Sequence, residues 1–174
     1  MSDETVGSKR ANIWIYAEIL TKDAYTLGTA HFYRANYWGR VYLYMGVSSI
    51  IFSVTAGTSL LYGSPLGEQL AGLLALISSI IIAVSTFIKP NKQEEDHSRA
   101  GFSFISLYYS VRVFCEVDII RKVEDENKLP DELHEFIKHR DGIDKTSPRI
   151  PKGTWSKAVI ASKAHFRKNP IRWD

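Results

Sequence analysis

Two long uncharged stretches dominate the hydrophobic pattern of this 174-residue chain. Residues 41–67 contain no charged side chain, one glutamate follows, and residues 69–88 are again uncharged. A helix rises about 1.5 Å per residue, so about 20 apolar residues cross the roughly 30 Å core of a bilayer. The segment between the two stretches has the composition of a turn, with Gly, Ser and Pro. The pattern predicts a transmembrane hairpin with spans at about residues 41–62 and 67–88.

Heptad-like patterns flank both predicted spans. Steps of four and three residues begin at Ile13 before the first span and at His97 after the second, beyond a break expected at Pro90. These patterns predict cytoplasmic helices at about residues 11–40 and 92–123, packed against each other as an antiparallel pair.

The expected fold is therefore all-α: a two-helix transmembrane hairpin whose helices extend into a cytoplasmic antiparallel helical bundle, with a C-terminal helical extension. Residues 1–10 are expected to be a flexible N-terminus, residues 11–123 the two-span domain, and residues 124–174 a basic extension. The extension should hold short helices, at about residues 131–139 and from an N-cap at Thr154. Apolar residues left over on the second cytoplasmic helix predict that further copies of the chain cover it, which makes a homo-oligomer. The alternative to a transmembrane hairpin is a buried helical hairpin inside a soluble domain.

Charge distribution indicates orientation. Basic residues precede the first span and follow the second, whereas the connecting turn contains none. The positive-inside rule then places both termini in the cytoplasm of a multi-pass protein. The N-terminus lacks the pattern of a cleaved signal peptide, and the formal net charge of +3 agrees with contact to anionic lipid. The single cysteine, Cys115, allows no internal disulfide and no cysteine metal cluster.

Small and polar residues gather on less than half of the second span, and they have two interpretations. In the first, small residues pack helices together in lipid. The residues expected to do so are Ala71, Ala75, Ser79 and Ala83, with Gly46, Ser49 and Ser53 on the first span. In the second, part of this face lines a pore between subunits, and Ile82 forms a hydrophobic constriction. The other residues of this pore-lining set are Ser78, Ser85 and Thr86.

A polar cluster is expected on the cytoplasmic side. Arg34 lies about as far before the first span as an acidic run lies after the second, and the hairpin brings them to similar heights. The residues of that run are Glu94, Glu95 and Asp96. Arg34 is predicted to pair with one of them, and His31 and His97 should lie within about one helical turn of that level. The alternative is a set of solvated surface charges, which contribute little.

Enzymatic motifs do not emerge. The chain contains neither a phosphate-binding loop nor a dinucleotide-binding glycine pattern. His134, Glu135 and His139 resemble a zinc-protease motif, but the histidines are five residues apart rather than four, so they cannot share a metal. No catalytic residue, metal or cofactor is therefore expected.

The C-terminal extension contains a basic helix. Its candidate contacts with a partner or surface are Lys157, Lys163, Arg167 and Lys168. Such a helix could lie on a membrane surface, dock on the cytoplasmic helices, or bind an acidic partner or nucleic acid. The sequence leaves these alternatives open.

The layout resembles the SLATT domains, two-transmembrane effector domains of bacterial conflict systems. The similarity covers about residues 11–123. It is carried by STFIKP at residues 85–90, EEDHSRAG at residues 94–101, and Leu107. Its most specific part follows the second span, where an acidic residue, His97 and Gly101 lead the helix. The segment from residue 124 onward departs from the core pattern.

The resemblance implies an antiphage effector in the bacterial inner membrane, which forms an oligomeric pore when a partner senses infection. Partners implied by the family are a nucleotidyltransferase, a nucleotide-sensing domain or a reverse transcriptase. The chain carries no such module, so the signal should come from a separate protein or a ligand. Two other hypotheses stay open: a membrane-anchored adaptor that binds a cytoplasmic partner through its helical arms and basic tail, and a constitutive channel for small solutes.

Overall fold

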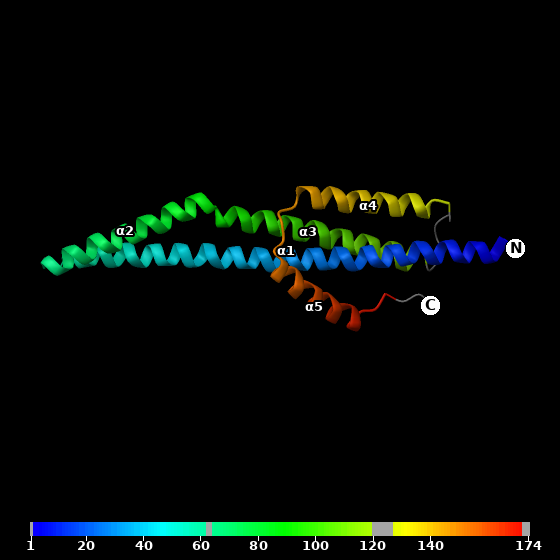
Figure 1. Ribbon diagram of the computed structural model, residues 1–174, viewed down its shortest axis with the longest axis horizontal. Helices are drawn as coiled ribbons and strands as arrows, with labels where there is room; N and C mark the ends of the chain where they lie inside the picture. Colours follow the sequence, from blue (N-terminus) through cyan, green and yellow to red (C-terminus); the bar gives the residue numbers. More distant parts are fainter. Residues whose placement is uncertain (1, 62–63, 120–126, 172–174) are drawn as a thin grey trace. The chain divides into compact units, whose positions relative to one another are not determined.

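Helices are the regular secondary structure of the residues that the computed structural model describes, which are 2–61, 64–119 and 127–171, with side chains from residue 9 onward. The elements are α1 (Ser2–Leu61), α2 (Pro65–Ile88), α3 (Pro90–Val113), the π-helical segment η1 (Phe114–Ile119), α4 (Leu129–Thr146) and α5 (Lys152–Lys168) (Figure 1). The predicted all-α class is confirmed. The chain divides into two compact units, one of residues 1–34 and 96–174 and one of residues 35–95.

Helix α1 already begins at Ser2, so it includes residues that the sequence predicted as a flexible N-terminus. One contact there has a clear cause. The guanidinium of Arg10 donates hydrogen bonds to the carbonyls of Asp118 and Ile119, at 3.3 and 3.1 Å. These carbonyls lie at the end of η1, where a cation is favoured.

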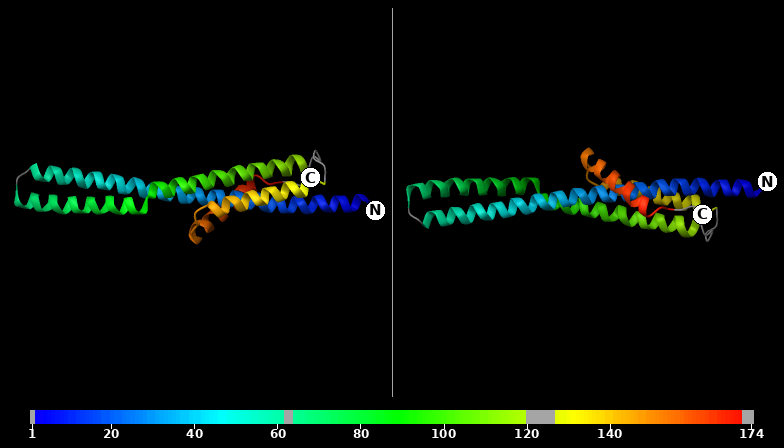
Figure 2. Two further views of the ribbon diagram at one scale, coloured as in Figure 1. Left: turned by 90° about the horizontal axis from the view of Figure 1, so that it is seen from above. Right: turned by 90° about the horizontal axis from the view of Figure 1, so that it is seen from below.

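In the unit of residues 35–95, α2 returns antiparallel beside the second part of α1 (Figure 2). Ser64 is the N-cap of α2, and its hydroxyl accepts a hydrogen bond from the backbone N–H of Gly67 at 3.1 Å. Pro65 starts the helix and Glu68 lies in its first turn, where a negative charge is favoured. Gly67 is needed for close approach, because a Cβ there would lie 2.8 Å from the carbonyl oxygen of Ser59.

The break predicted at Pro90 is confirmed. Lys89 adopts the left-handed conformation (φ 50°, ψ 58°) and its N–H closes α2 on the carbonyl of Ser85 at 2.9 Å. Pro90 then starts α3, because a proline at the first helical position lacks only an N–H that would be unpaired there.

In the other unit, α1 and α3 pack along the predicted heptad positions. Those that are buried are Ala17, Leu20, Ala24, Leu27 and His31 on α1, and His97, Gly101, Phe104, Tyr108 and Val111 on α3. The two backbones approach closely at Gly28. A Cβ at Gly28 would lie 2.8 Å from Cγ1 of Ile105 and 3.2 Å from the carbonyl oxygen of Gly101.

The π-helical segment η1 changes the register at the end of this pair. A π turn contains an extra residue, so the buried position after Cys115 falls on Ile119 instead of Asp118, which the regular heptad predicted. The predicted continuation of this helix through residues 120–123 lies outside the described residues.

Helix α4 covers part of the remaining apolar face of α3 and η1, whereas Phe102 and Val113 stay exposed. Leu129 and Leu133 of α4 are buried in the same core as Leu107, Phe114 and Ile119. Much of the surface that was expected to need further copies of the chain is therefore covered within one chain. Helix α4 also continues to Thr146, through residues predicted to be a loop, and Arg140 binds Asp23 of α1 at 2.9 Å.

Helix α5 docks on α1 of the same unit. Ala158 and Ser162 are buried, the hydroxyls of Thr26 and Ser162 lie 2.8 Å apart, and His165 stacks on Tyr25 with ring centroids 4.1 Å apart. The helix starts at Lys152 after Pro151, so the predicted N-cap, Thr154, lies inside its first turn. Pro151 is the N-cap residue instead, and its carbonyl accepts hydrogen bonds from the N–H groups of Thr154 and Trp155.

Among the described residues, two helical segments are long and apolar enough to cross a membrane, Lys9–Leu61 and Pro65–Ile119. Of the most apolar 18-residue stretch in each segment, only 6% is buried in the first and 11% in the second. A core helix of a soluble domain is mostly buried, so these segments differ from one in exposing their apolar side chains.

Candidate functional site

The contact between α1 and α2 uses only some of the residues predicted to pack the helices together: Ala71, Ser49 and Ser53. On α2 the side facing α1 contains Ala71, Leu74, Ser78, Ile81 and Ser85, at alternating steps of three and four. Ala75, Ser79 and Ala83 are exposed, so of the predicted packing series only Ala71 is buried. The physical reason is helical phase: a step of four advances about 40° around the helix, whereas alternating steps stay on one face.

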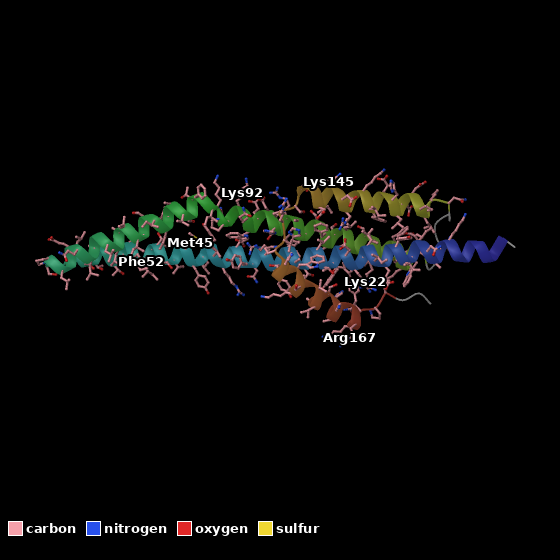
Figure 3. All side chains as sticks on the ribbon, viewed as in Figure 1. Lys22, Met45, Phe52, Lys92, Lys145 and Arg167 are labelled. Atoms are coloured by element: carbon pink, nitrogen blue, oxygen red, sulfur yellow. The ribbon has the colours of Figure 1, made fainter. Side chains whose placement is uncertain are left out.

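On α1 the half-buried or buried positions facing α2 are Val41, Met45, Ser48, Ser49, Phe52, Ala56 and Ser59; Met45 and Phe52 are labelled in Figure 3. Gly46, which was predicted to pack, is exposed, and a Cβ built on it meets no atom within 4 Å. Helix phase again separates Gly46 from the contact face.

Ser78 belongs to the packing contact, not to an exposed polar lining. Its side chain is only 3% exposed. Its hydroxyl lies 2.8 Å from the hydroxyl of Ser53 and 3.3 Å from that of Ser49, and it donates to the carbonyl of Ser49 at 3.1 Å. This serine cluster joins α1 to α2, as polar side chains do between helices in an apolar environment.

The other predicted pore-lining residues divide between two faces. Ser85 is half-buried toward α1, whereas Ile82 and Thr86 are exposed on the same face of α2 as Ala75 and Ser79. The hydroxyls of Thr86 and Ser79 donate to the carbonyls of Ile82 and Ala75, at 2.9 and 2.8 Å. Because the helix satisfies these donors itself, the exposed small-residue face can meet either lipid or another helix.

Two buried histidines form the most unusual polar contact of the chain. Nδ1 of His31 on α1 lies 3.0 Å from Nδ1 of His97 on α3, and His31 stacks on Phe104 with ring centroids 5.6 Å apart. The structure thus brings together the two histidines that the register placed at one level. A 3.0 Å contact requires one ring to donate and the other to accept, so at least one Nδ1 must be unprotonated.

Burial and neighbouring charges keep this pair neutral. Desolvation and, to a smaller extent, the proximity of His97 lower the pKa of His31 from 6.5 to about 4, against an opposite effect of Asp144. The pKa of His97 is also lowered, first by burial and then by Arg34, while Asp96 opposes the shift. Both rings are therefore uncharged at neutral pH.

Two charged members of the predicted cluster, Arg34 and Asp96, lie near this pair. Arg34 and Asp96 act on His97 with opposite signs, which places both in its electrostatic environment. Glu94 lies elsewhere, over Gly39, where a Cβ would be 2.8 Å from its Oε1. The pairing of Arg34 with Glu94, Glu95 or Asp96 stays a prediction.

Metal and nucleophile chemistry find little support in this geometry. The described residues contain no group of three or more His, Cys, Asp or Glu side chains that could hold a metal ion, so His31 and His97 would supply only two ligands. Cys115 is buried in the core, and burial raises the pKa of its thiol to about 12. A thiol with such a pKa is not a nucleophile at neutral pH.

The basic residues predicted on the C-terminal helix are exposed. Lys157, Lys163, Arg167 and Lys168 are exposed on α5, whereas Ala158 and Ser162 are buried toward α1. Figure 3 marks Arg167 on this helix. Docking of α5 on its own chain and an exposed basic face therefore coexist.

Sequence reasoning missed a polar network beneath α5. The hydroxyl oxygen of Tyr108 lies 3.2 Å from Nε2 of His165 and accepts a hydrogen bond from Nη1 of Arg112 at 2.8 Å. Only the position of Tyr108 on the heptad pattern hinted at it. His165 lies 57 residues away in the sequence, and no local signal connects the two.

No protein-family model, curated protein or solved structure matches this chain. The functional argument therefore rests on the residues themselves.

Proposed function

We propose that the chain is an oligomeric membrane effector: a helical hairpin whose spans associate through the small-residue face of α2 and open a pore across the bacterial inner membrane. The observation that carries this proposal is the exposure of the two long apolar segments, which leaves large side chains uncovered along residues 41–88. In lipid these side chains would be solvated by acyl chains.

The division of the exposed surface of α2 supports oligomerisation. One side presents Gly72, Ala75, Ser79, Ala83 and Thr86, and the other presents bulky residues such as Leu73, Leu76, Ile80 and Phe87. Bulky aliphatic side chains suit lipid, whereas small side chains let a second helix approach closely. A two-helix subunit cannot enclose water alone, so a pore requires several copies.

Ile82 lies on the small-residue face and is the proposed constriction. Ile80, on the bulky face, is the matched control, because the two side chains are exposed to almost the same extent, 53% for Ile82 and 54% for Ile80. A charge at a pore-facing position changes permeation, whereas the same charge facing lipid only disfavours insertion.

The test is dye and ion leakage from liposomes that contain the purified chain, at equal amounts of inserted protein, for wild type, Ile82→Asp and Ile80→Asp. The proposal expects Ile82→Asp to change leakage and Ile80→Asp to reduce insertion without changing leakage per inserted chain. Equal effects of the two variants, or no leakage with any activating partner, would overturn it. By the positive-inside rule both termini should be cytoplasmic, which protease protection of tagged chains would check.

The SLATT resemblance adds the expectation of antiphage defence, with activation by a separate signal-producing protein. The adaptor hypothesis has its own observation, the exposed basic face of α5 that docking leaves free. Charge reversal at Lys163 and Arg167 separates the two: an adaptor loses its partner, whereas a pore former keeps its leakage.

A further inference from the structure

A basic groove lies between α1, the end of α4 and the start of α5. Its volume is about 560 Å³, and it is lined among others by Lys145, Arg149, Lys152 and Trp155, with His31 on its buried side. Figure 3 marks Lys145 at the C-terminal end of α4. Ligand sites for small molecules typically occupy about 300–1,000 Å³.

The charges of the groove are unbalanced. Lys145, Arg149 and Lys152 are exposed and form no ion pair within the part of the chain that the structure describes. Asp144 is the only acidic residue in the lining. Some other cations of this unit do have acidic partners: Lys22 binds Glu18, and Lys138 binds Glu135. Three cations around one carboxylate create a local excess of positive charge that attracts anions.

The backbone adds to this attraction. Helix α5 starts in the groove at Lys152, and its N-cap residue, Pro151, provides no side-chain hydrogen bond. The first N–H groups of a helix and its dipole favour a negative group at this end.

The rest of the lining is apolar and partly aromatic. Trp155 is 37% exposed, and Leu27, Pro148 and Ile150 complete the surface. An exposed indole beside cations suits a ligand with an anionic end and a planar or apolar body.

We propose that this groove binds a phosphate-bearing ligand, with the phosphate on Lys145, Arg149 and Lys152 and the body of the ligand against Trp155. The phosphate could belong to a soluble organic phosphate or to a lipid headgroup. This inference concerns ligand binding only and does not depend on the proposed pore.

The experiment is isothermal titration calorimetry on the full chain in nanodiscs. In the first arm the nanodiscs contain only phosphatidylcholine, and the probes are phenyl phosphate, inorganic phosphate and benzyl alcohol. Phenyl phosphate should bind best and benzyl alcohol worst. In the second arm, nanodiscs with and without phosphatidic acid are compared, and competition of the lipid against phenyl phosphate identifies the headgroup as the source.

Variants assign the site. The double variant Lys145→Gln with Arg149→Gln should weaken phenyl phosphate binding at least about tenfold, because each charge-assisted hydrogen bond contributes strongly. Trp155→Ala should remove the preference for phenyl phosphate over inorganic phosphate. Asp144→Asn should strengthen binding, since it removes the only opposing charge in the lining.

Lys163→Gln is the matched control, because Lys163 is an exposed cation of α5 outside the groove. Thermal unfolding of each variant, followed by circular dichroism, shows that it is folded. Absence of phosphate binding in both arms, or equal loss of binding in Lys163→Gln and the groove variants, would overturn the proposal.

Discussion

His31 and His97 share a hydrogen bond between their Nδ1 atoms, 3.0 Å apart, inside the contact between α1 and α3. Both side chains are buried, so neither can be protonated without disrupting the contact or bringing water to it. The pair therefore makes the packing of these two helices sensitive to protons.

The unit that contains this pair should lose stability as the pH falls. The unfolded chain has histidine pKa values near 6.5, whereas the pKa of His31 in the folded state is about 4 and that of His97 is also lowered. Above pH 6.5 the stabilisation is fully present. As the pH falls toward 4 the unfolded chain takes up protons that the folded chain does not, which costs on the order of 3 kcal/mol for His31. Thermal unfolding between pH 7.5 and 4 measures this loss.

The variant His31→Gln should flatten that pH dependence, and His139→Gln, at an exposed position, should leave it unchanged. A wild-type chain with the same melting temperature at pH 7.5 and pH 5 would contradict the assignment.

Gly28 should tolerate no side chain. Gly28→Ala places a Cβ 2.8 Å from Cγ1 of Ile105, and the expected destabilisation is about 1–3 kcal/mol. Gly142→Ala is the opposite case, because nothing lies within 4 Å of a Cβ there, and alanine in a helix should stabilise by about 0.5–1 kcal/mol. Chemical unfolding measures both. Adding Ile105→Ala to Gly28→Ala should recover part of the loss. If Gly28→Ala and Gly142→Ala changed the free energy of unfolding equally, the close approach at Gly28 would be refuted.

Ser78 and Ser79 should respond differently to the same enlargement. Ser78→Leu inserts volume between α1 and α2 and removes the hydroxyl that contacts Ser49 and Ser53, so the helical pair should lose about 1–3 kcal/mol. Ser79→Leu adds an apolar side chain at an exposed position and should leave that pair intact. Loss of helicity on titration with a denaturing detergent measures this, and equal sensitivity of the two variants would show that Ser78 does not lie in the contact.

Cys115 should be protected from thiol reagents in the folded chain. Its burial and its pKa of about 12 leave neither access nor thiolate at neutral pH. In a Cys115→Ser background, Ser110→Cys supplies an exposed thiol as reference. Mass spectrometry after a maleimide pulse should show at least about 100-fold slower labelling of Cys115. Comparable rates would mean that the core around η1 opens readily.

Much of the helical architecture was readable from the sequence, because it depends on local physics. The two apolar stretches and the absence of proline from residues 2–61 predict long helices. Pro90 predicts the break that Lys89 completes in the left-handed conformation. Alternating steps of three and four residues also identified the buried face of α1 around Leu20, Leu27 and His31, since that spacing keeps side chains on one side of a helix.

Tertiary structure alone decided which residues meet. The small-residue run at steps of four drifts around α2, so Ala75, Ser79 and Ala83 lie outside the contact that Ser78 and Ile81 occupy. Helix α4 covered apolar residues of α3 that seemed to require another subunit, since nothing local in its sequence specifies its docking site. The groove beside Trp155 likewise joins α1 to residues more than 100 positions away, and only packing of distant helices can create it.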